Sequence, residues 1–164
     1  MSITPKERAM RAAQAMWDKD RASQWVGMSL VDVDEGRAIL SLTVAPHHCN
    51  GHGTCHGGIT FTLADSAFAF ACNSRNQSTV AQHNMISFTA PAREGDVLTA
   101  TAQEVSLVGR NGIYDVRVTT QDGTVIGEMR GLSRAIKGQL FEDCLLYTSP
   151  SPRDQRGSRM PSSA

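Results

Sequence analysis

The hydrophobic and polar positions at the start of the chain follow two different periods. Residues 5–18 carry hydrophobic side chains at three- and four-residue spacing, which predicts an amphipathic helix. In residues 37–44, Ala38, Leu40, Leu42 and Val44 alternate instead with Arg37, Ile39, Ser41 and Thr43, and this two-residue period predicts a strand with one face more buried. Gly36 marks the turn before that strand and Pro46 marks its end. The first third of the chain therefore predicts a helix followed by a strand.

The longest hydrophobic run of the chain covers residues 59–72. Alanine, phenylalanine and leucine dominate it, and Ile59 is its one β-branched hydrophobic residue, so its length and composition favour a helix over a strand. Its hydrophobic residues point nearly all round, which predicts a buried helix. Asp65 lies inside this run, although burying an unpaired carboxylate is costly. The residue is either structural, bonded to Thr62 or to backbone, or it has a chemical role.

Strand-like segments separated by good turns fill the part of the chain that follows this helix. They cover residues 79–90, 97–108, 112–120 and 124–137. Long strands with short connections fit an antiparallel meander. The whole pattern predicts an α+β fold in which one antiparallel sheet wraps around a long central helix.

Two regions of different character divide the 164 residues. Residues 1–140 are long enough for one domain with a hydrophobic core. Residues 141–164 are rich in serine, proline and arginine and lack hydrophobic periodicity, which predicts a disordered or non-native C-terminal tail.

Charge and cysteine content narrow the class of protein. The 16 basic and 16 acidic residues cancel and form no basic block, which argues against a nucleic-acid partner. No hydrophobic run reaches the roughly 18 residues that cross a bilayer, and the first 22 residues do not resemble a secretory signal. The four cysteines show no paired framework, so we expect reduced thiols. A cytoplasmic protein without a membrane partner is predicted.

The loop 47–58 is rich in glycine, histidine and cysteine, and its chemistry has several interpretations. A zinc site usually takes two separated ligand pairs, whereas these candidate ligands crowd into ten residues, so we predict no metal. A Cys55 nucleophile activated by His56 or His52 is also disfavoured, because the side chains of adjacent residues point apart and a Cys–His system usually needs a third, orienting group.

A third interpretation uses the backbone at the start of the predicted helix. Its first N–H groups lack partners within the helix, and Gly57 and Gly58 let a substrate approach them closely. Such a helix start is suited to a developing oxyanion. Asp65 lies eight residues further on, about 12 Å along the helix axis. Because one reacting carbon cannot contact both, Gly57 and Asp65 can cooperate only if a second copy supplies one of them.

The stretch NGHGTCHGGITFTLADSAFAFACNS, residues 50–74, resembles the signature of the hot-dog-fold acyl-CoA thioesterases. It is most similar to the phenylacetic-acid-degradation branch, whose members carry HGG, LAD and a following asparagine at these spacings. The resemblance extends over residues 8–138, and it includes YDV at 114–116 and RG at 130–131.

The resemblance implies roles for individual residues. The backbone N–H of Gly57 would bind the thioester carbonyl, and Asp65 of the other subunit would attack directly or activate a water. Asn50 would orient the thioester or the water, and His56 would shape the loop or assist polarisation. The implied substrate-binding residues are Gly58, Phe61 and Phe68 near the helix, with Arg93, Arg110 and Arg134 for the phosphates of coenzyme A.

The implied activity is hydrolysis of an acyl-CoA, with an aromatic or phenylacetyl-type acyl group, to a free acid and coenzyme A. Coenzyme A is then part of the substrate, and no cofactor is expected. The implied assembly is a homodimer or a dimer of dimers. Two alternatives remain: another hot-dog enzyme, such as a dehydratase or hydratase, and a non-catalytic protein that binds acyl-CoA.

Overall fold

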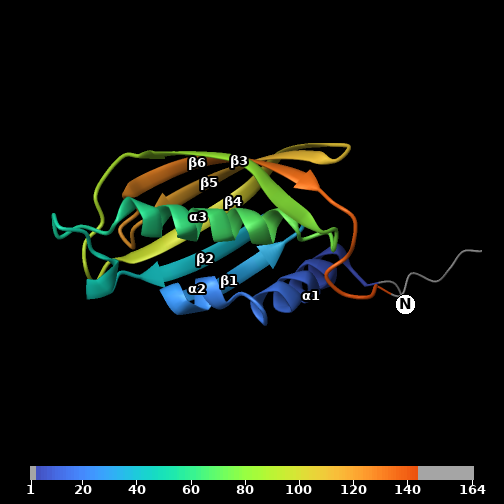
Figure 1. Cartoon of the computed structure of the whole chain (residues 1–164), viewed down its shortest axis with the longest axis horizontal. Helices are drawn as coiled ribbons and strands as arrows, with labels where there is room; N and C mark the ends of the chain where they lie inside the picture. The colour runs from blue at the N-terminus through green and yellow to red at the C-terminus, as the bar shows by residue number, and fades with distance from the viewer. Residues whose placement is uncertain (1–2, 144–164) are drawn as a thin grey trace, which may run out of the picture.

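A computed structural model describes residues 3–143 of the chain (Figure 1). The helices are α1 (Pro5–Trp17), α2 (Arg21–Val26), the short 3-10 helix η1 (Pro46–His48) and α3 (Gly57–Cys72). The strands are β1 (Met28–Asp34), β2 (Arg37–Thr43), β3 (Thr79–Phe88), β4 (Val97–Val108), β5 (Asn111–Thr119) and β6 (Val125–Ala135). The predicted helices and the predicted strands are all present, with ends that agree within two residues.

The strands form one antiparallel sheet in the order β1-β2-β4-β5-β6-β3, and α3 lies across one of its faces (Figure 1). The predicted α+β fold is therefore confirmed. Two details differ. The elements α2 and β1 were not predicted, and the meander is limited to β4, β5 and β6, because β3 lies beyond β6 and forms the edge of the sheet.

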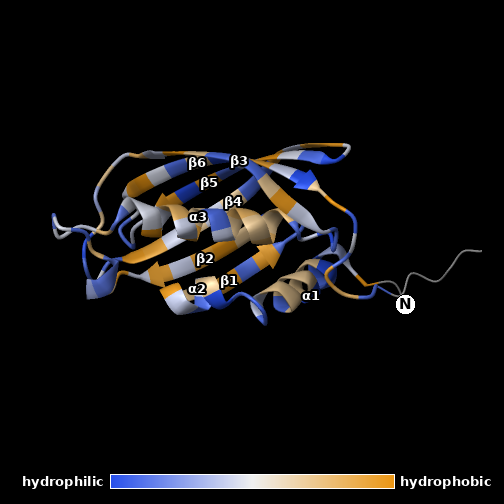
Figure 2. Cartoon of the chain, viewed as in Figure 1, coloured by the Kyte–Doolittle hydropathy of each residue, from blue (hydrophilic) through white to orange (hydrophobic). Residues whose placement is uncertain are grey.

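The interior of the protein lies between α3 and the sheet. Leu63, Ala67 and Phe68 of α3 face the sheet and are at most 1% exposed. Leu40 and Leu98, on neighbouring strands below the helix, are fully buried, and hydrophobic residues recur along these strands in Figure 2. This packing buries hydrophobic area on both layers, so it fixes the position of α3 on the sheet.

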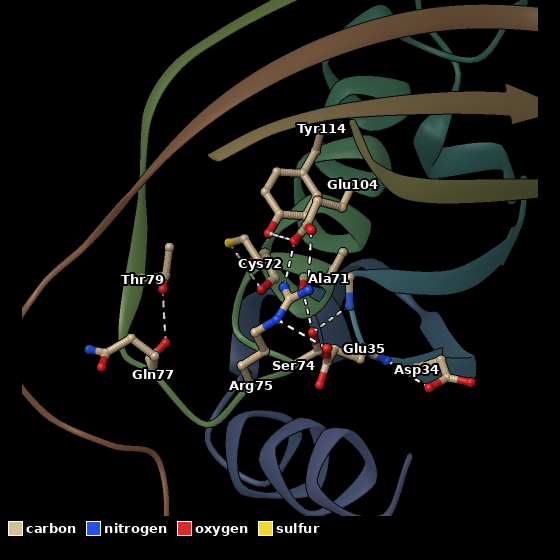
Figure 3. Close-up of polar contacts among 12 residues, drawn as sticks. Asp34, Glu35, Ala71, Cys72, Ser74, Arg75, Gln77, Thr79, Glu104 and Tyr114 are labelled. Carbon is tan, nitrogen blue, oxygen red and sulfur yellow. Dashed lines mark hydrogen bonds and ion pairs between the residues drawn. The ribbon is translucent and has the colours of Figure 1, made fainter. Parts of the chain in front are cut away.

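A polar cluster fixes the C-terminal end of α3 (Figure 3). Arg75 donates to both carboxylate oxygens of Glu104 on β4, at 2.5 and 3.1 Å, and pairs with Glu35 at 3.3 Å. The hydroxyl of Tyr114, a buried residue of β5, donates to Glu104 at 2.8 Å. Burial would raise the pKa of Glu104, but the hydrogen bonds from Arg75 and Tyr114 outweigh it and lower that pKa. The cluster joins the end of α3 to β4, to β5 and to the turn between β1 and β2.

The two ends of the described chain meet at α1. Thr4 caps this helix through a capping box with Glu7. Arg8 pairs with Asp143 at 2.9 Å, and the guanidinium of Arg11 lies 4.5 Å from the ring centre of Phe141. Packing contacts thus continue past residue 140, where the domain was predicted to end, and the rest of the predicted tail lies outside the described residues. No helix within residues 3–143 is long and hydrophobic enough to cross a membrane.

Candidate active site

The start of α3 presents one unused backbone donor. The imidazole Nδ1 of His56, the N-cap residue, accepts the N–H of Gly58 at 2.9 Å. The N–H groups of Ile59 and Thr60 donate to the carbonyl of His56 at 2.9 and 3.3 Å. The N–H of Gly57 has no acceptor among residues 3–143. Because the helix dipole adds partial positive charge here, this N–H is suited to an anionic oxygen.

Gly57 opens into a cavity of about 430 Å³ between α3 and the end of β3. Cys55, Thr60 and Phe88 are among its lining residues. A side chain at Gly57 would place its Cβ only 3.1 Å from the ring of Phe88. The absence of a side chain therefore keeps the free N–H open to the cavity.

Asn50 holds the loop that leads into α3. Its Oδ1 accepts the N–H of His52 at 2.9 Å and both the N–H and the hydroxyl of Thr54 at 3.3 Å. The loop is closed by the backbone pair Cys49 and Cys55, where Asn50 donates to Thr54 and His56 donates to His48. Within the described residues the Nδ2 of Asn50 has no acceptor, so the side chain can hold the turn and still donate to a bound group.

Asp65 lies in the middle of α3 and is half-buried. Its Oδ1 accepts a hydrogen bond of 2.5 Å from Nδ2 of Asn84, on β3. The structural alternative with Thr62 is absent, because the Thr62 hydroxyl donates to the carbonyl of Gly58 at 2.7 Å. Burial raises the pKa of Asp65, and the hydrogen bond from Asn84 opposes that rise. The other oxygen, Oδ2, has no partner in the described part of the chain and is not fully enclosed.

Asn84 was not predicted as a site residue. Its Oδ1 is enclosed and lacks a donor within the described chain, which costs about 1–3 kcal/mol in typical proteins. Gly131 on β6 leaves room for it, since a Cβ at that position would lie 2.9 Å from this oxygen. In the sequence, Asn84 appears only as a polar residue inside a predicted strand, and nothing nearby indicates the contact with Asp65.

The remaining predicted binding residues lie in three places. Gly58 is exposed at the helix start, and Phe61 is half-buried. Phe68 is 1% exposed and packs edge-on against Tyr114, with ring centres 5.5 Å apart, so its ring belongs to the core. The three arginines do not form one group, because Arg93 and Arg110 lie in turns at opposite ends of the sheet and Arg134 lies on β6.

Arg110 and Arg134 lie at one end of the sheet, where the Arg110 side chain donates to the carbonyl of Ala135 at 2.9 Å. Arg134 pairs in register with Val80, near the start of β3. Arg93 lies at the other end, in the turn between β3 and β4, and its backbone N–H donates to Asp96. Arg110 and Arg134 thus form a basic pair, whereas Arg93 is separate from them.

Within one chain, Gly57 and Asp65 belong to separate places on the same helix. β3 runs beside α3 in the opposite direction, since Phe88 lies next to Gly57 and Asn84 contacts Asp65. Four strand residues span about 13 Å, which agrees with the about 12 Å between Gly57 and Asp65 along the helix. One chain therefore supplies the oxyanion donor and the carboxylate at two separate points.

The fold and these residues define a hot-dog thioesterase architecture, and comparisons with known proteins agree. Residues 52–126 match the model of the family described as Thioesterase superfamily. The chain belongs to the thioesterase superfamily. It is 39% identical over 133 residues to acyl-coenzyme A thioesterase PaaI of Escherichia coli, covering 81% of this chain and 95% of that protein.

Solved structures give the same result. The structure of the E. coli PaaI protein from the phenylacetic acid degradation operon superposes with a TM-score of 0.82 at 38% identity, covering 83% of this chain and 99% of that one. The TT0310 protein of Thermus thermophilus superposes with a TM-score of 0.67 at 32% identity, covering 70% and 96%. In this chain, Gly57 and Asp65 both lie on α3, the central helix of the fold.

Proposed function

We propose that the chain is an acyl-CoA thioesterase that hydrolyses aromatic, phenylacetyl-type acyl-CoA substrates. The observation that carries this proposal is the pairing, on one helix, of a free N–H at Gly57 with a half-buried carboxylate at Asp65. A thioester needs its carbonyl polarised and a nucleophile delivered to it, and these two groups meet both needs. The phenylacetyl-type substrate is supported by the similarity to PaaI from the phenylacetic acid degradation operon.

The active site is completed by a second copy. β3 is an edge strand of ten residues, and its side chains are largely exposed, including the hydrophobic Val80, Met85 and Phe88. A long edge with exposed hydrophobic residues is a template for pairing with another strand. Two copies of β3 related by a two-fold axis run antiparallel, so the α3 helices packed on them run antiparallel as well. Asp65 of one copy then lies toward the helix start of the other.

Hydrolysis follows from these groups with protons and bonds balanced. A water gives a proton to Asp65 while its oxygen adds to the thioester carbonyl carbon, and the resulting oxyanion accepts the N–H of Gly57. Collapse of this intermediate breaks the carbon–sulfur bond, and the leaving thiolate of coenzyme A takes up the proton held by Asp65, which restores the carboxylate. Direct attack by Asp65 would instead form a mixed anhydride that water later cleaves. Where water cleaves this anhydride at the aspartyl carbon, a single turnover in H₂¹⁸O leaves unlabelled oxygen from Asp65 in the acid product and ¹⁸O in Asp65, whereas attack of water on the thioester labels the acid.

Mixing two inactive variants tests both the chemistry and the shared site. Asp65→Asn lacks the carboxylate, and a bulky Gly57→Val blocks the oxyanion donor, so each homodimer should be inactive. A mixed dimer has one intact site, built from Asp65 of one copy and Gly57 of the other. After unfolding and refolding together in equal amounts, about a quarter of the wild-type activity should return. No recovery, with dimers formed normally, would mean that the site lies within one chain.

Release of free coenzyme A distinguishes this activity from the other hot-dog chemistry. A thiol reagent added to phenylacetyl-CoA and enzyme should report one thiol for each acid formed. A dehydratase or hydratase would change the acyl chain and leave the thioester intact, so no thiol would appear. Tight binding of coenzyme A without turnover would indicate a non-catalytic binding protein.

A further inference from the structure

The contact between Asp65 and Asn84 joins the centre of α3 to the centre of β3. Nδ2 of Asn84 donates to Oδ1 of Asp65, whereas Oδ2 of Asp65 remains without a partner among residues 3–143. The two carboxylate oxygens therefore have different surroundings. One is held by the protein, and the other is left to act on a bound group.

We propose that Asn84 is a positioning residue that holds the Asp65 carboxylate with Oδ2 directed at the reacting thioester or water. This inference rests on the proposed function, since it assigns a task to a partner of Asp65. A single bond to Oδ1 fixes the rotation of the carboxylate about its terminal torsion, which is otherwise broad. Fixing that rotation before substrate binds removes a conformational cost from the reaction.

The orientation of the Asn84 amide supports a functional role over a packing role. Its Oδ1 is enclosed beside Gly131 without a donor, while Nδ2 faces Asp65. An ionised carboxylate can only accept hydrogen bonds, so the amide must present Nδ2 to it. A hydrophobic side chain of similar size would avoid the unpartnered oxygen. A need for a hydrogen-bond donor to ionised Asp65 explains why an asparagine occupies this position despite its unpartnered oxygen.

Other titratable groups near α3 do not replace this donor. The thiol of Cys72, on the same helix, has a pKa raised to about 12 by burial and stays neutral near pH 7. Tyr114 on β5 donates to Glu104, which Arg75 holds at the far end of α3. Other charged or titratable groups on the described elements around α3 are the exposed His83 on β3 and several groups held by other partners: Asp20 by Ser23, Arg37 by Asp32, Arg117 by Glu128, Arg130 by Asp115 and Arg134 by Asn111.

The pH dependence of kcat/KM separates positioning from a structural role. Because the Asn84 amide stabilises the ionised form of Asp65, removing it should move the acid limb of the profile to higher pH. Asn84→Ala should lower kcat on the order of 10- to 100-fold with little change in KM. The isosteric Asn84→Asp places a second carboxylate beside Asp65 and should move the limb further in the same direction. Gln103→Ala, which removes an exposed amide on β4, is the matched control and should leave the profile unchanged.

Three variants compared in parallel make each outcome decisive. If Asp65→Asn abolishes turnover and both Asn84 variants shift the acid limb, the inference stands. If Asp65→Asn abolishes turnover but the limb stays in place in both Asn84 variants, Asn84 is structural and only this inference fails. If Asp65→Asn keeps its turnover, the proposed function of Asp65 fails first and the role of Asn84 fails with it. Should Asn84→Ala not fold, Asn84→Asp carries the same test, since it keeps the size of the side chain.

Discussion

The ring of Phe88 occupies the space that a side chain at Gly57 would enter, with 3.1 Å between the ring and the position of a Cβ. Phe88 belongs to β3 and Gly57 to the first turn of α3, so this contact sets how closely the edge of the sheet approaches the helix start. A contact of this length is tighter than ordinary van der Waals packing. Either the ring or the helix start must move when a methyl group is added.

We therefore expect Gly57→Ala to lower kcat/KM for phenylacetyl-CoA by about 10- to 1,000-fold, since the backbone donor is displaced from the thioester oxygen. Gly51→Ala is the matched control. Gly51 belongs to the same loop, and a Cβ there meets nothing within 4 Å. Steady-state kinetics on both variants test this expectation. Equal kcat/KM in the two variants would show that catalysis does not depend on the absence of a side chain at Gly57.

The burial of Asp65 predicts a gain in stability when its charge is removed. Its pKa is raised by burial, so the folded protein binds the proton more tightly than the unfolded chain. Above the folded pKa the buried charge destabilises the fold, and Asp65→Asn should melt at a higher temperature than wild type at pH 7–8. The difference should shrink as the pH falls through the folded pKa. Calorimetry between pH 8 and pH 4 measures it, and a variant less stable than wild type at pH 8 would contradict the reasoning.

The sequence predicted the parts of the fold that depend on local patterns. The two-residue alternation before Thr43 and the hydrophobic run after Ile59 correspond to β2 and α3. β1 was missed because Met28–Asp34 mixes hydrophobic and polar residues without a clean alternation, and its pairing with β2 shifts register between Leu30 and Asp32. The position of β3 beyond β6 was also missed, since the order of strands depends on packing around α3 and not on the turns between strands.

The site was predictable where a motif carried it and unpredictable where contacts cross between elements. Gly57, Gly58 and Asp65 lie on α3, and His56 is its N-cap residue. The partner of Asp65 comes from Asn84, nineteen positions later on another element, and no local pattern links the two. Phe68 was expected beside the substrate, but its ring is in the core, because a helix without a wholly polar face does not reveal which residues point to the sheet.

The Arg75 cluster predicts a stability effect that is separate from activity. Glu104 keeps a lowered pKa because Arg75 and Tyr114 donate to it, although burial opposes them. Arg75→Ala removes that charge partner and should lower the free energy of unfolding by about 1–3 kcal/mol at pH 7. The loss should lessen as the pH drops below about 4.5, the ordinary pKa of this group, because the wild-type advantage is lost as Glu104 protonates.

Urea unfolding at several pH values tests this effect against an exposed ion pair. Arg117 and Glu128 are 2.8 Å apart with side chains 62% and 42% exposed. Arg117→Ala should change stability by no more than about 0.5 kcal/mol. The activity of folded Arg75→Ala should equal that of wild type, since the cluster lies at the end of α3 remote from Gly57. Equal destabilisation by Arg75→Ala and Arg117→Ala would mean that the burial of Glu104 does not strengthen its ion pair with Arg75.

The position of the three arginines predicts which of them bind coenzyme A. Arg110 and Arg134 lie together near the start of β3, and an antiparallel β3 pair brings that end toward the helix start of the partner. We expect Arg110→Ala and Arg134→Ala each to raise KM several-fold with kcat nearly unchanged, because a phosphate contact remote from the thioester affects binding in the ground state and the transition state equally. Adding salt should raise the KM of the wild type more than the KM of the variants, because salt screens the attraction between the arginines and the phosphates.

Arg93 provides the comparison, because it lies at the opposite end of the sheet, where its backbone binds Asp96. Arg93→Ala should leave KM within about two-fold of wild type. A large rise in KM for this variant, with none for the other two, would place the nucleotide end of coenzyme A at the turn between β3 and β4 and not beside Arg110 and Arg134.

The exposed edge of the sheet predicts how the protein assembles. Met85 lies in the middle of β3 and is 62% exposed. A lysine at an edge strand opposes strand pairing, because its charge would have to lose water at the new interface. Met85→Lys should therefore convert dimers to monomers, as measured by light scattering during gel filtration. Turnover should fall with the dimer fraction, because neither copy alone has a complete site.

Val31→Lys provides the control, because Val31 is 58% exposed on β1, which forms the opposite edge of the sheet. Its variant should stay dimeric and active, and a monomeric but fully active Met85→Lys would show that one chain suffices for catalysis.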